Sequence, residues 1–323
     1  METPSKDKSR SYGERKIPVK LPRLHGVVFG KIVGEGFFSH VYNGTYRDKP
    51  AAIKLVEREN SNGHLKEIEF LKKLRGVPDI VQLYSVFEAD NTFLVFELLE
   101  SCTPAYFYEN TTVPRLRHYI KHVLNALKGA HSQNIVHRDV KFSNVLVSPT
   151  WDRISLIDWG CASYISESMS SCAGSRITRS PEMLLGYKGY KTGCDSWAVG
   201  TLIIDILTEG KVPWKKESTQ ETLISLTHFF GAEDIIKIAG RYCLPLDPTL
   251  LSKMTKDPIR NLETKFTERM QPIWTKKLRK LTLGLLQIDP EKRLSVEKAM
   301  KARYFFKRRK ITRELYPVTL TFD

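Results

Sequence analysis

The chain has 323 residues, of which 41% are hydrophobic, 27% charged and 10% aromatic, so it can bury a substantial core and is neither disordered nor fibrous. Its 51 lysines and arginines exceed its 36 acidic residues, and the net charge of +15 favours anionic partners such as phosphates or acidic peptides. No apolar run approaches the roughly 18 residues of a membrane-spanning helix. The polar first 20 residues lack the apolar core of a secretory signal, and the five cysteines form no CxxC pair, which indicates reduced thiols. We therefore expect an intracellular protein, in the nucleus or the cytoplasm, without a membrane segment.

Residues 1–24 form a basic arm without apolar periodicity, and short β-branched and apolar runs follow it. Five such runs predict the strands of a small antiparallel sheet, at residues 27–33, 41–45, 51–56, 80–87 and 93–97. One helix is predicted among them, at residues 65–74, and Ser61, Asn62 or Gly63 can begin it. Its apolar stripe consists of Leu65, Ile68, Leu71 and Leu74. On this helix we expect Glu67 to point inward and Glu69 to pair with Lys73 on the outside.

From residue 100 onward the periodicity is mainly helical, as in residues 115–132, and two short strands at 145–147 and 154–157 lie next to polar loops. The pattern indicates an α+β fold with a small sheet lobe at about 25–99, a larger helical lobe at about 100–306 and a tail at 307–323. His118 and His122 are four residues apart on the predicted helix, opposite its apolar face. We expect both histidines to be solvated rather than to bind a metal.

A turn with two glycines, Gly34 and Gly36, joins the first two predicted strands. Glycines at such a turn let backbone amides approach phosphate oxygens, although a hairpin with two glycines is as often simple turn chemistry. Lys54 ends an apolar strand and is either an edge-strand charge or a cation held for a phosphate. Glu67 favours the second interpretation, because an inward carboxylate needs a cation and Lys54 is the natural one.

Two polar loops carry the candidate chemistry of the helical lobe. Asp139 and Asn144 are five residues apart on the first loop, a spacing at which a carboxylate can receive a hydroxyl proton while an amide oxygen binds a metal. Asp158 follows the second short strand and offers the hard oxygen that Mg2+ prefers. Each of these features alone is about as often structural as functional, but together and in this order they are not accidental.

These motifs resemble those of the eukaryotic protein kinase family, over about residues 27–306. The resemblance implies the bilobal protein kinase fold and an ATP-dependent serine/threonine kinase that uses ATP and Mg2+. By resemblance, Asp139 accepts the proton of the substrate hydroxyl and Lys141 contacts the γ-phosphate. Asn144 and Asp158 are the implied Mg2+ ligands.

The resemblance also implies a nucleotide site. Lys54 is expected to contact the α- and β-phosphates and to pair with Glu67, and Gly34 and Gly36 to cover the phosphates. The remaining residues implied at the nucleotide site are Val33, Val41, Ala52, Phe96, Glu97, Leu99 and Leu146.

Other positions are implied to be structural. Asp195 is expected to support the catalytic loop, residues 137–144. Glu182, at the end of the activation segment (residues 158–182), is expected to pair with Arg293. We expect the buried indole N–H of Trp159 to find a hydrogen-bond partner and so to fix the metal-binding segment. Arg138 could bind a phosphate on the activation segment, although we expect activity to depend little on one.

Residues 156–160 are most similar to those of the catalytic (alpha) subunits of casein kinase two, and residues 173–176 and 229–231 are also similar to those of the cell division cycle seven kinases. Both branches imply a regulatory subunit and protein substrates with acidic residues around the phosphoacceptor. Arg176 and Arg179, with Ser175, are therefore candidate substrate-binding residues, since arginine binds carboxylates bidentately. The alternative is that the two arginines hold a phosphate of the activation segment itself.

Two other classes of protein remain open. One is a catalytically weak scaffold with a kinase fold, which the presence of all the residues named for catalysis disfavours. The other is a nucleic-acid-binding protein, suggested by the charge alone. Because no aromatic and basic recognition module accompanies that charge, we expect no specific nucleic-acid partner.

Overall fold

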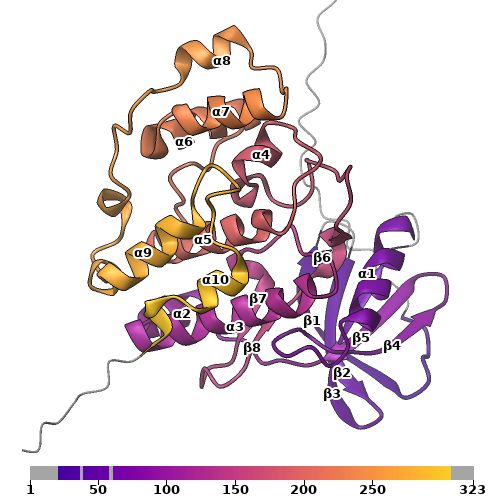
Figure 1. The fold of residues 1–323 in the computed structure, drawn as a ribbon. Helices are drawn as coiled ribbons and strands as arrows, with labels where there is room; N and C mark the ends of the chain where they lie inside the picture. Colours follow the sequence, from indigo (N-terminus) through magenta and orange to yellow (C-terminus); the bar gives the residue numbers. More distant parts are fainter. Residues whose placement is uncertain (1–20, 37–38, 58–60, 307–323) are drawn as a thin grey trace, which may run out of the picture.

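The computed structural model describes residues 21–36, 39–57 and 61–306, which fold into a sheet lobe and a helical lobe lying side by side (Figure 1). The sheet has five antiparallel strands in the order β1-β2-β3-β5-β4. Their bounds are β1 Val27–Gly36, β2 Ser39–Tyr46, β3 Lys49–Val56, β4 Leu83–Glu88 and β5 Thr92–Glu97. Helix α1, Ser61–Lys73, is the helix of this lobe. The α+β fold with two lobes that the sequence predicted is confirmed.

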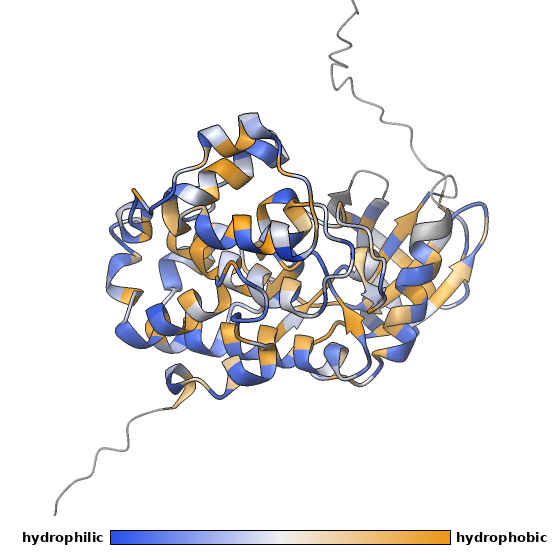
Figure 2. Ribbon diagram, turned by 45° about the horizontal axis from the view of Figure 1, so that its top comes forward, coloured by the Kyte–Doolittle hydropathy of each residue, from blue (hydrophilic) through white to orange (hydrophobic). Residues whose placement is uncertain are grey.

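The helical lobe begins after the chain leaves β5. Its helices are α2 Pro104–Asn110, α3 Val113–His131, α4 Pro181–Leu184, α5 Gly193–Leu207, α6 Thr219–Phe230, α7 Glu233–Arg241, α8 Pro248–Lys253, α9 Lys276–Leu285 and α10 Val296–Met300. Two short antiparallel pairs complete it: β6 Ile135–Val136 with β9 Ser163–Tyr164, and β7 Val145–Val147 with β8 Ile154–Leu156. In Figure 2 hydrophobic residues recur at intervals along the helices rather than in long runs, as amphipathic helices require.

The register of the sheet decides which side chains share a face. Lys54 lies opposite Val41 on β2, and Ala52, two residues before Lys54, lies opposite Phe96 on β5. Because directly opposed residues and residues two apart on a strand point to the same side, these four side chains share one face. The other face forms a separate core around Ile53 and similar residues of β2, β3 and β5, which Leu21 and Leu24 help to cover.

Helix α1 begins at Ser61, one of the residues expected to begin it. The expectation that Leu65 belongs to its buried apolar stripe is wrong, because that side chain is 52% exposed. Leu65 lies with Val86 along an open groove between α1 and β4, which leaves it outside the core. Phe70, only 3% exposed, is buried in its place.

The segment before β4 joins the two lobes instead of extending the strand to residue 80. The backbone N–H of Leu156 on β8 donates to the carbonyl of Asp79 at 2.8 Å, and Val81 donates back to Leu156 at 3.2 Å. The carboxylate of Asp79 also lies 2.7 Å from Nδ1 of His122 and accepts a hydrogen bond from Asn125 at 2.7 Å. The prediction that His122 is simply solvated is therefore wrong, because it contacts an acid 43 residues away.

Helix α5 is the centre of the helical lobe. Thirteen of its 15 residues are buried, and α3 and α9 pack against it. The burial includes Asp195 in its first turn, which is 0% exposed. A carboxylate placed so deeply must be compensated by hydrogen bonds or cations, and those partners define the candidate site.

Candidate active site

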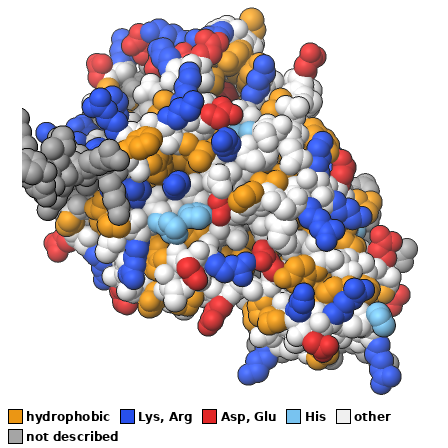
Figure 3. Space-filling model, turned by 60° about the horizontal axis from the view of Figure 1, so that its bottom comes forward, with side chains coloured by type: hydrophobic (Ala, Val, Ile, Leu, Met, Phe, Trp, Pro, Cys, Tyr) orange, Lys and Arg blue, Asp and Glu red, His pale blue; other side chains and the backbone are white. Residues whose placement is uncertain are grey.

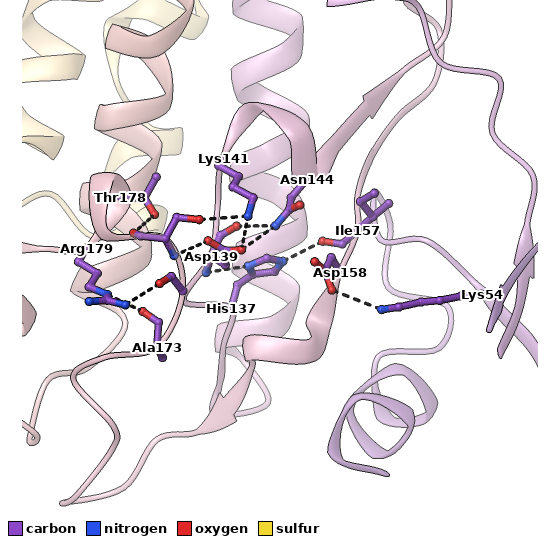
Figure 4. Close-up of polar contacts among 12 residues, drawn as sticks. Lys54, His137, Asp139, Lys141, Asn144, Ile157, Asp158, Ala173, Thr178 and Arg179 are labelled. Atoms are coloured by element: carbon purple, nitrogen blue, oxygen red, sulfur yellow. Dashed lines mark hydrogen bonds and ion pairs between the residues drawn. The ribbon is translucent and has the colours of Figure 1, made fainter. Parts of the chain in front are cut away.

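The loop between β6 and β7 directs several polar side chains at one carboxylate, that of Asp139 (Figure 4). Its Oδ2 accepts from Nζ of Lys141 at 2.7 Å and from Nδ2 of Asn144 at 3.1 Å, and its Oδ1 accepts from the backbone N–H of Ser175 at 2.8 Å. Lys141 also donates to the hydroxyl of Ser175 at 3.0 Å. Asp139 is 5% exposed, so these donors fix its orientation in a largely dry environment.

Asp195 holds the backbone of this loop. Its carboxylate accepts from the N–H of His137 at 2.9 Å and from the N–H of Arg138 at 2.8 Å, and it lies 2.8 Å from Nε2 of His131. Burial alone would raise the pKa of Asp195, but the hydrogen bond and charge of His131, with the other donors, outweigh it and hold that pKa below its ordinary value. Arg138 has a φ of 68°, a left-handed conformation unusual for a non-glycine residue. The two backbone bonds to Asp195 maintain it.

A second charged group connects the lobes. Nζ of Lys54 donates to both carboxylate oxygens of Glu67 at 2.9 Å and lies 3.5 Å from Oδ1 of Asp158. Burial alone would lower the pKa of Lys54, but Glu67 and Asp158 outweigh it and hold that pKa above its ordinary value. Burial would likewise raise the pKa of Asp158, but Lys54 and other cations hold it below its ordinary value. The ammonium and the Asp158 carboxylate are therefore charged at neutral pH.

The residues expected to line a nucleotide site come from both lobes. Val41, Ala52 and Phe96 share the sheet face from which Lys54 reaches Asp158. Gly34 pairs with Val41 across β1 and β2, and Val33 beside it is 57% exposed. Leu146, on β7 of the other lobe, is half-buried. Gly36 ends β1, next to residues 37 and 38 that lie outside the described part of the chain.

The connection between the lobes carries Glu97 and Leu99, both half-buried. One carboxylate oxygen of Glu97 accepts from the N–H of Gln82 at 3.0 Å, and the other lies 2.7 Å from the guanidinium of Arg153. The side chain of Glu97 is thus bound to both lobes. The resemblance to protein kinases implies that the backbone of residues 97–99 binds adenine.

The donor set fits Mg2+ bound together with phosphate. Among the described residues, no group of three or more His, Cys, Asp and Glu side chains could hold a metal ion by itself. Asp158 supplies an ionised carboxylate and Asn144 an amide oxygen. Mg2+ characteristically takes one or two such protein ligands and completes its shell with phosphate oxygens and water.

Arginines hold the segment after Asp158 through backbone carbonyls. Arg138 donates to the carbonyls of Cys161 at 2.6 Å and Ala162 at 3.2 Å, and also to the hydroxyl of Tyr190 at 3.2 Å. Arg179 donates to the carbonyls of residues 173 and 174 at 3.0 and 2.8 Å. The two guanidinium groups thus bind backbone carbonyls at two places along the segment.

Arg176 is directed at a different part of the lobe. It donates to the backbone carbonyls of Lys216, at 3.1 Å, and Glu217. These contacts join the segment to the loop before α6. Both Arg176 and Arg179 are half-buried, and each binds backbone carbonyls with part of its guanidinium group.

Close backbone approach and a buried ion pair fix the ends of the segment. Gly174 has a φ of +67°, and a Cβ there would lie 2.0 Å from the carbonyl oxygen of Arg138, so only glycine fits. Glu182 and Arg293 form two hydrogen bonds of 2.8 Å with both side chains buried. The structure confirms the predicted pairing.

The expectation for Trp159 is wrong. The ring is fully buried and packs edge-on against His137, with centroids 4.7 Å apart. Its indole N–H, however, has no hydrogen-bond partner in the described part of the chain. Trp159 therefore contributes packing rather than a polar link.

The contact of His131 with Asp195 was not predicted, since the last residue of an amphipathic helix gives no sign of a partner 64 residues away.

Comparison with known proteins agrees with this geometry. The family model described as the protein kinase domain matches residues 27–305. Casein kinase II subunit alpha' of Saccharomyces cerevisiae is 27% identical over 280 residues, which cover 84% of this chain and 82% of that protein. The chain belongs to the protein kinase family and is a protein kinase phosphotransferase. The described residues contain no helix long and apolar enough to cross a membrane.

Proposed function

We propose that the chain transfers the γ-phosphate of ATP to serine or threonine hydroxyls in acidic surroundings. The observation that carries the proposal is the convergence of Lys141, Asn144 and the Ser175 amide on the Asp139 carboxylate, with Lys54 directed at Asp158. When bound, Mg-ATP supplies the phosphoryl group and the metal neutralises its charge. Likeness to a yeast casein kinase II subunit supports the serine and threonine class.

Each side chain then has a positional task. The remaining lone pair of Asp139, on Oδ1, accepts the proton of the acceptor hydroxyl, and Lys141, only 2.7 Å away from Oδ2, is in position to contact the transferred phosphoryl group. Lys54, kept in place by Glu67, offers its charge to the α- and β-phosphates. Asn144 and Asp158 offer oxygen ligands to the metal. Since there is little covalent chemistry for the protein to perform, rigid placement of these groups supplies most of the catalysis.

The acidic preference rests on the free donors of Arg176 and Arg179. A guanidinium has five N–H donors, and each of these two uses only part of its set on carbonyls. Both arginines follow Ser175 within four residues of the chain, and Ser175 contacts Asp139. We propose that a carboxylate following the phosphoacceptor binds their remaining donors.

The test is phosphate transfer from Mg-ATP by the purified chain to serine peptides with acidic, basic or proline flanks, with Asp139→Asn as the inactive control. Preference for the acidic peptide, lost in the control, supports the proposal. Preference for basic or proline-flanked peptides would refute the acidic specificity. Equal turnover by Asp139→Asn would refute the assigned role of that residue.

We also propose an intracellular regulatory subunit, by analogy with both kinase branches. If the chain alone is silent and gains activity with such a subunit, the cell division cycle seven type is favoured. Binding of Mg-ATP without turnover under any condition favours a scaffold. On the face drawn in Figure 3, lysine and arginine side chains are scattered among acidic and apolar ones, so this face offers no continuous basic surface to a nucleic acid.

A further inference from the structure

The side chain of Tyr164 contacts three residues of α1. Its hydroxyl donates to Oε1 of Glu69 at 2.9 Å, and its ring packs edge-on against Phe70 with centroids 5.0 Å apart. Nζ of Lys73 lies 4.7 Å from the centroid of the same ring, within cation–π range. Glu69 and Lys73, expected to pair with each other, both contact this tyrosine instead. We call these four residues the Tyr164 cluster.

The backbone of Tyr164 belongs to the other lobe. Strand β9 pairs with β6, where Tyr164 lies opposite Ile135, and the N–H of Ile165 donates to the carbonyl of Asn134 at 2.9 Å. Strand β6 ends at Val136, directly before the catalytic loop. Tyr164 therefore connects the base of the catalytic loop to the helix of the sheet lobe.

Helix α1 also carries Glu67, two residues before Glu69. Glu67 points to the other side and binds Lys54 at 2.9 Å. Both glutamates lie on the same helical turn, so a rigid shift of α1 that lengthens the Tyr164 contact also displaces the Glu67 carboxylate. The helix is thus bound on one side by β3 and on the other by β9.

We propose that Tyr164 is a positioning residue: its contacts with the other three members of the Tyr164 cluster keep α1 where Glu67 can hold Lys54. The inference rests on the function proposed above for Lys54 and Glu67. Tyr164 acts through the helix and touches none of the reacting groups. Phosphate transfer should therefore respond to loss of its hydroxyl only while Glu67 is present.

The experiment measures kcat and KM with Mg-ATP and the acidic peptide for Tyr164→Phe, for Glu67→Ala and for the double variant. Phenylalanine keeps the ring contacts, so the fold is preserved, and melting curves verify this. We expect Tyr164→Phe to lower kcat about three- to tenfold, the range that the net contribution of one typical hydrogen bond allows, because this bond is exposed to solvent. KM for the peptide should not change. The matched control is Tyr106→Phe, which loses a hydroxyl bond of 3.2 Å to the carbonyl of Pro149 on the surface of the helical lobe.

In the Glu67→Ala background we expect Tyr164→Phe to cause no further loss, because both changes release the same helix. Glu69→Gln, whose amide oxygen still accepts a hydrogen bond, should retain most activity, and Glu69→Ala should behave like Tyr164→Phe. A full additional loss in the double variant, or a Tyr164→Phe enzyme no different from the Tyr106→Phe control, would overturn the positioning role while leaving the proposed function intact. An unaffected Glu67→Ala enzyme would instead overturn the role assigned to Glu67.

Discussion

The buried pair between Glu182 and Arg293 offers the largest predicted stability effect. Arg293→Met removes the cation and leaves the Glu182 carboxylate, 1% exposed, without its two hydrogen bonds. Breaking such a pair from one side costs about 3 to 5 kcal/mol, because a charge remains buried and uncompensated. For a domain of this size each kcal/mol corresponds to about 2 to 4 °C in melting temperature. We therefore expect Tm to fall by about 6 to 20 °C.

The structure also predicts an asymmetry between the two partners. Arg293 donates to the backbone carbonyls of Gln287, Ile288 and Gly193 as well, at 2.8 to 2.9 Å. Glu182→Gln leaves the guanidinium with these three acceptors, so it should destabilise less than Arg293→Met. In the double variant the charge left behind is absent, and we expect it to be more stable than Arg293→Met alone.

The assay is thermal unfolding at one fixed scan rate, since kinases of this size need not refold reversibly. An exposed ion pair, Glu233 with Lys237, provides the control: its side chains are 77% and 56% exposed, and Lys237→Ala should leave Tm unchanged. If Arg293→Met shifts Tm no more than Lys237→Ala, the argument from burial is wrong.

Two further outcomes follow from the charges. Burial, only partly offset by Lys215, raises the pKa of Asp205 to about 6, above its unfolded value. The folded state therefore loses stability as pH rises from about 4 to 6. Asp205→Asn should raise Tm at pH 7.5 and have no effect near pH 4, and an equal rise at both pH values would contradict this. Phosphatase treatment should leave phosphate transfer unchanged, because Arg138 and Arg179 already bind backbone carbonyls, and abolished activity would show that a phosphate orders the segment.

The sequence predicted the sheet and the long helices well, because alternating and helical periodicities record which face is buried. It also predicted that Glu67 would meet Lys54, because an inward carboxylate without a cation is too costly to bury. The Asp79 contact with His122 could not be foreseen, since neither residue type nor spacing indicates a pair 43 residues apart. The same limit applies wherever an arginine binds backbone carbonyls, which every residue possesses and no sequence pattern marks.

The two halves of the site differ in how firmly they are held. Asp195, in the first turn of the buried helix α5, binds the backbone of the catalytic loop, and Gly193 of the same turn binds Arg293. The catalytic loop and the end of the activation segment are therefore anchored to the most buried element of the protein. Helix α1 also buries Phe70, Leu71 and Leu74 in the main core and packs against residues 159–161, but its polar link to β9, the bond from Tyr164 to Glu69, is exposed. Local stability follows burial, so we expect this link to open more readily than the buried contacts of α5.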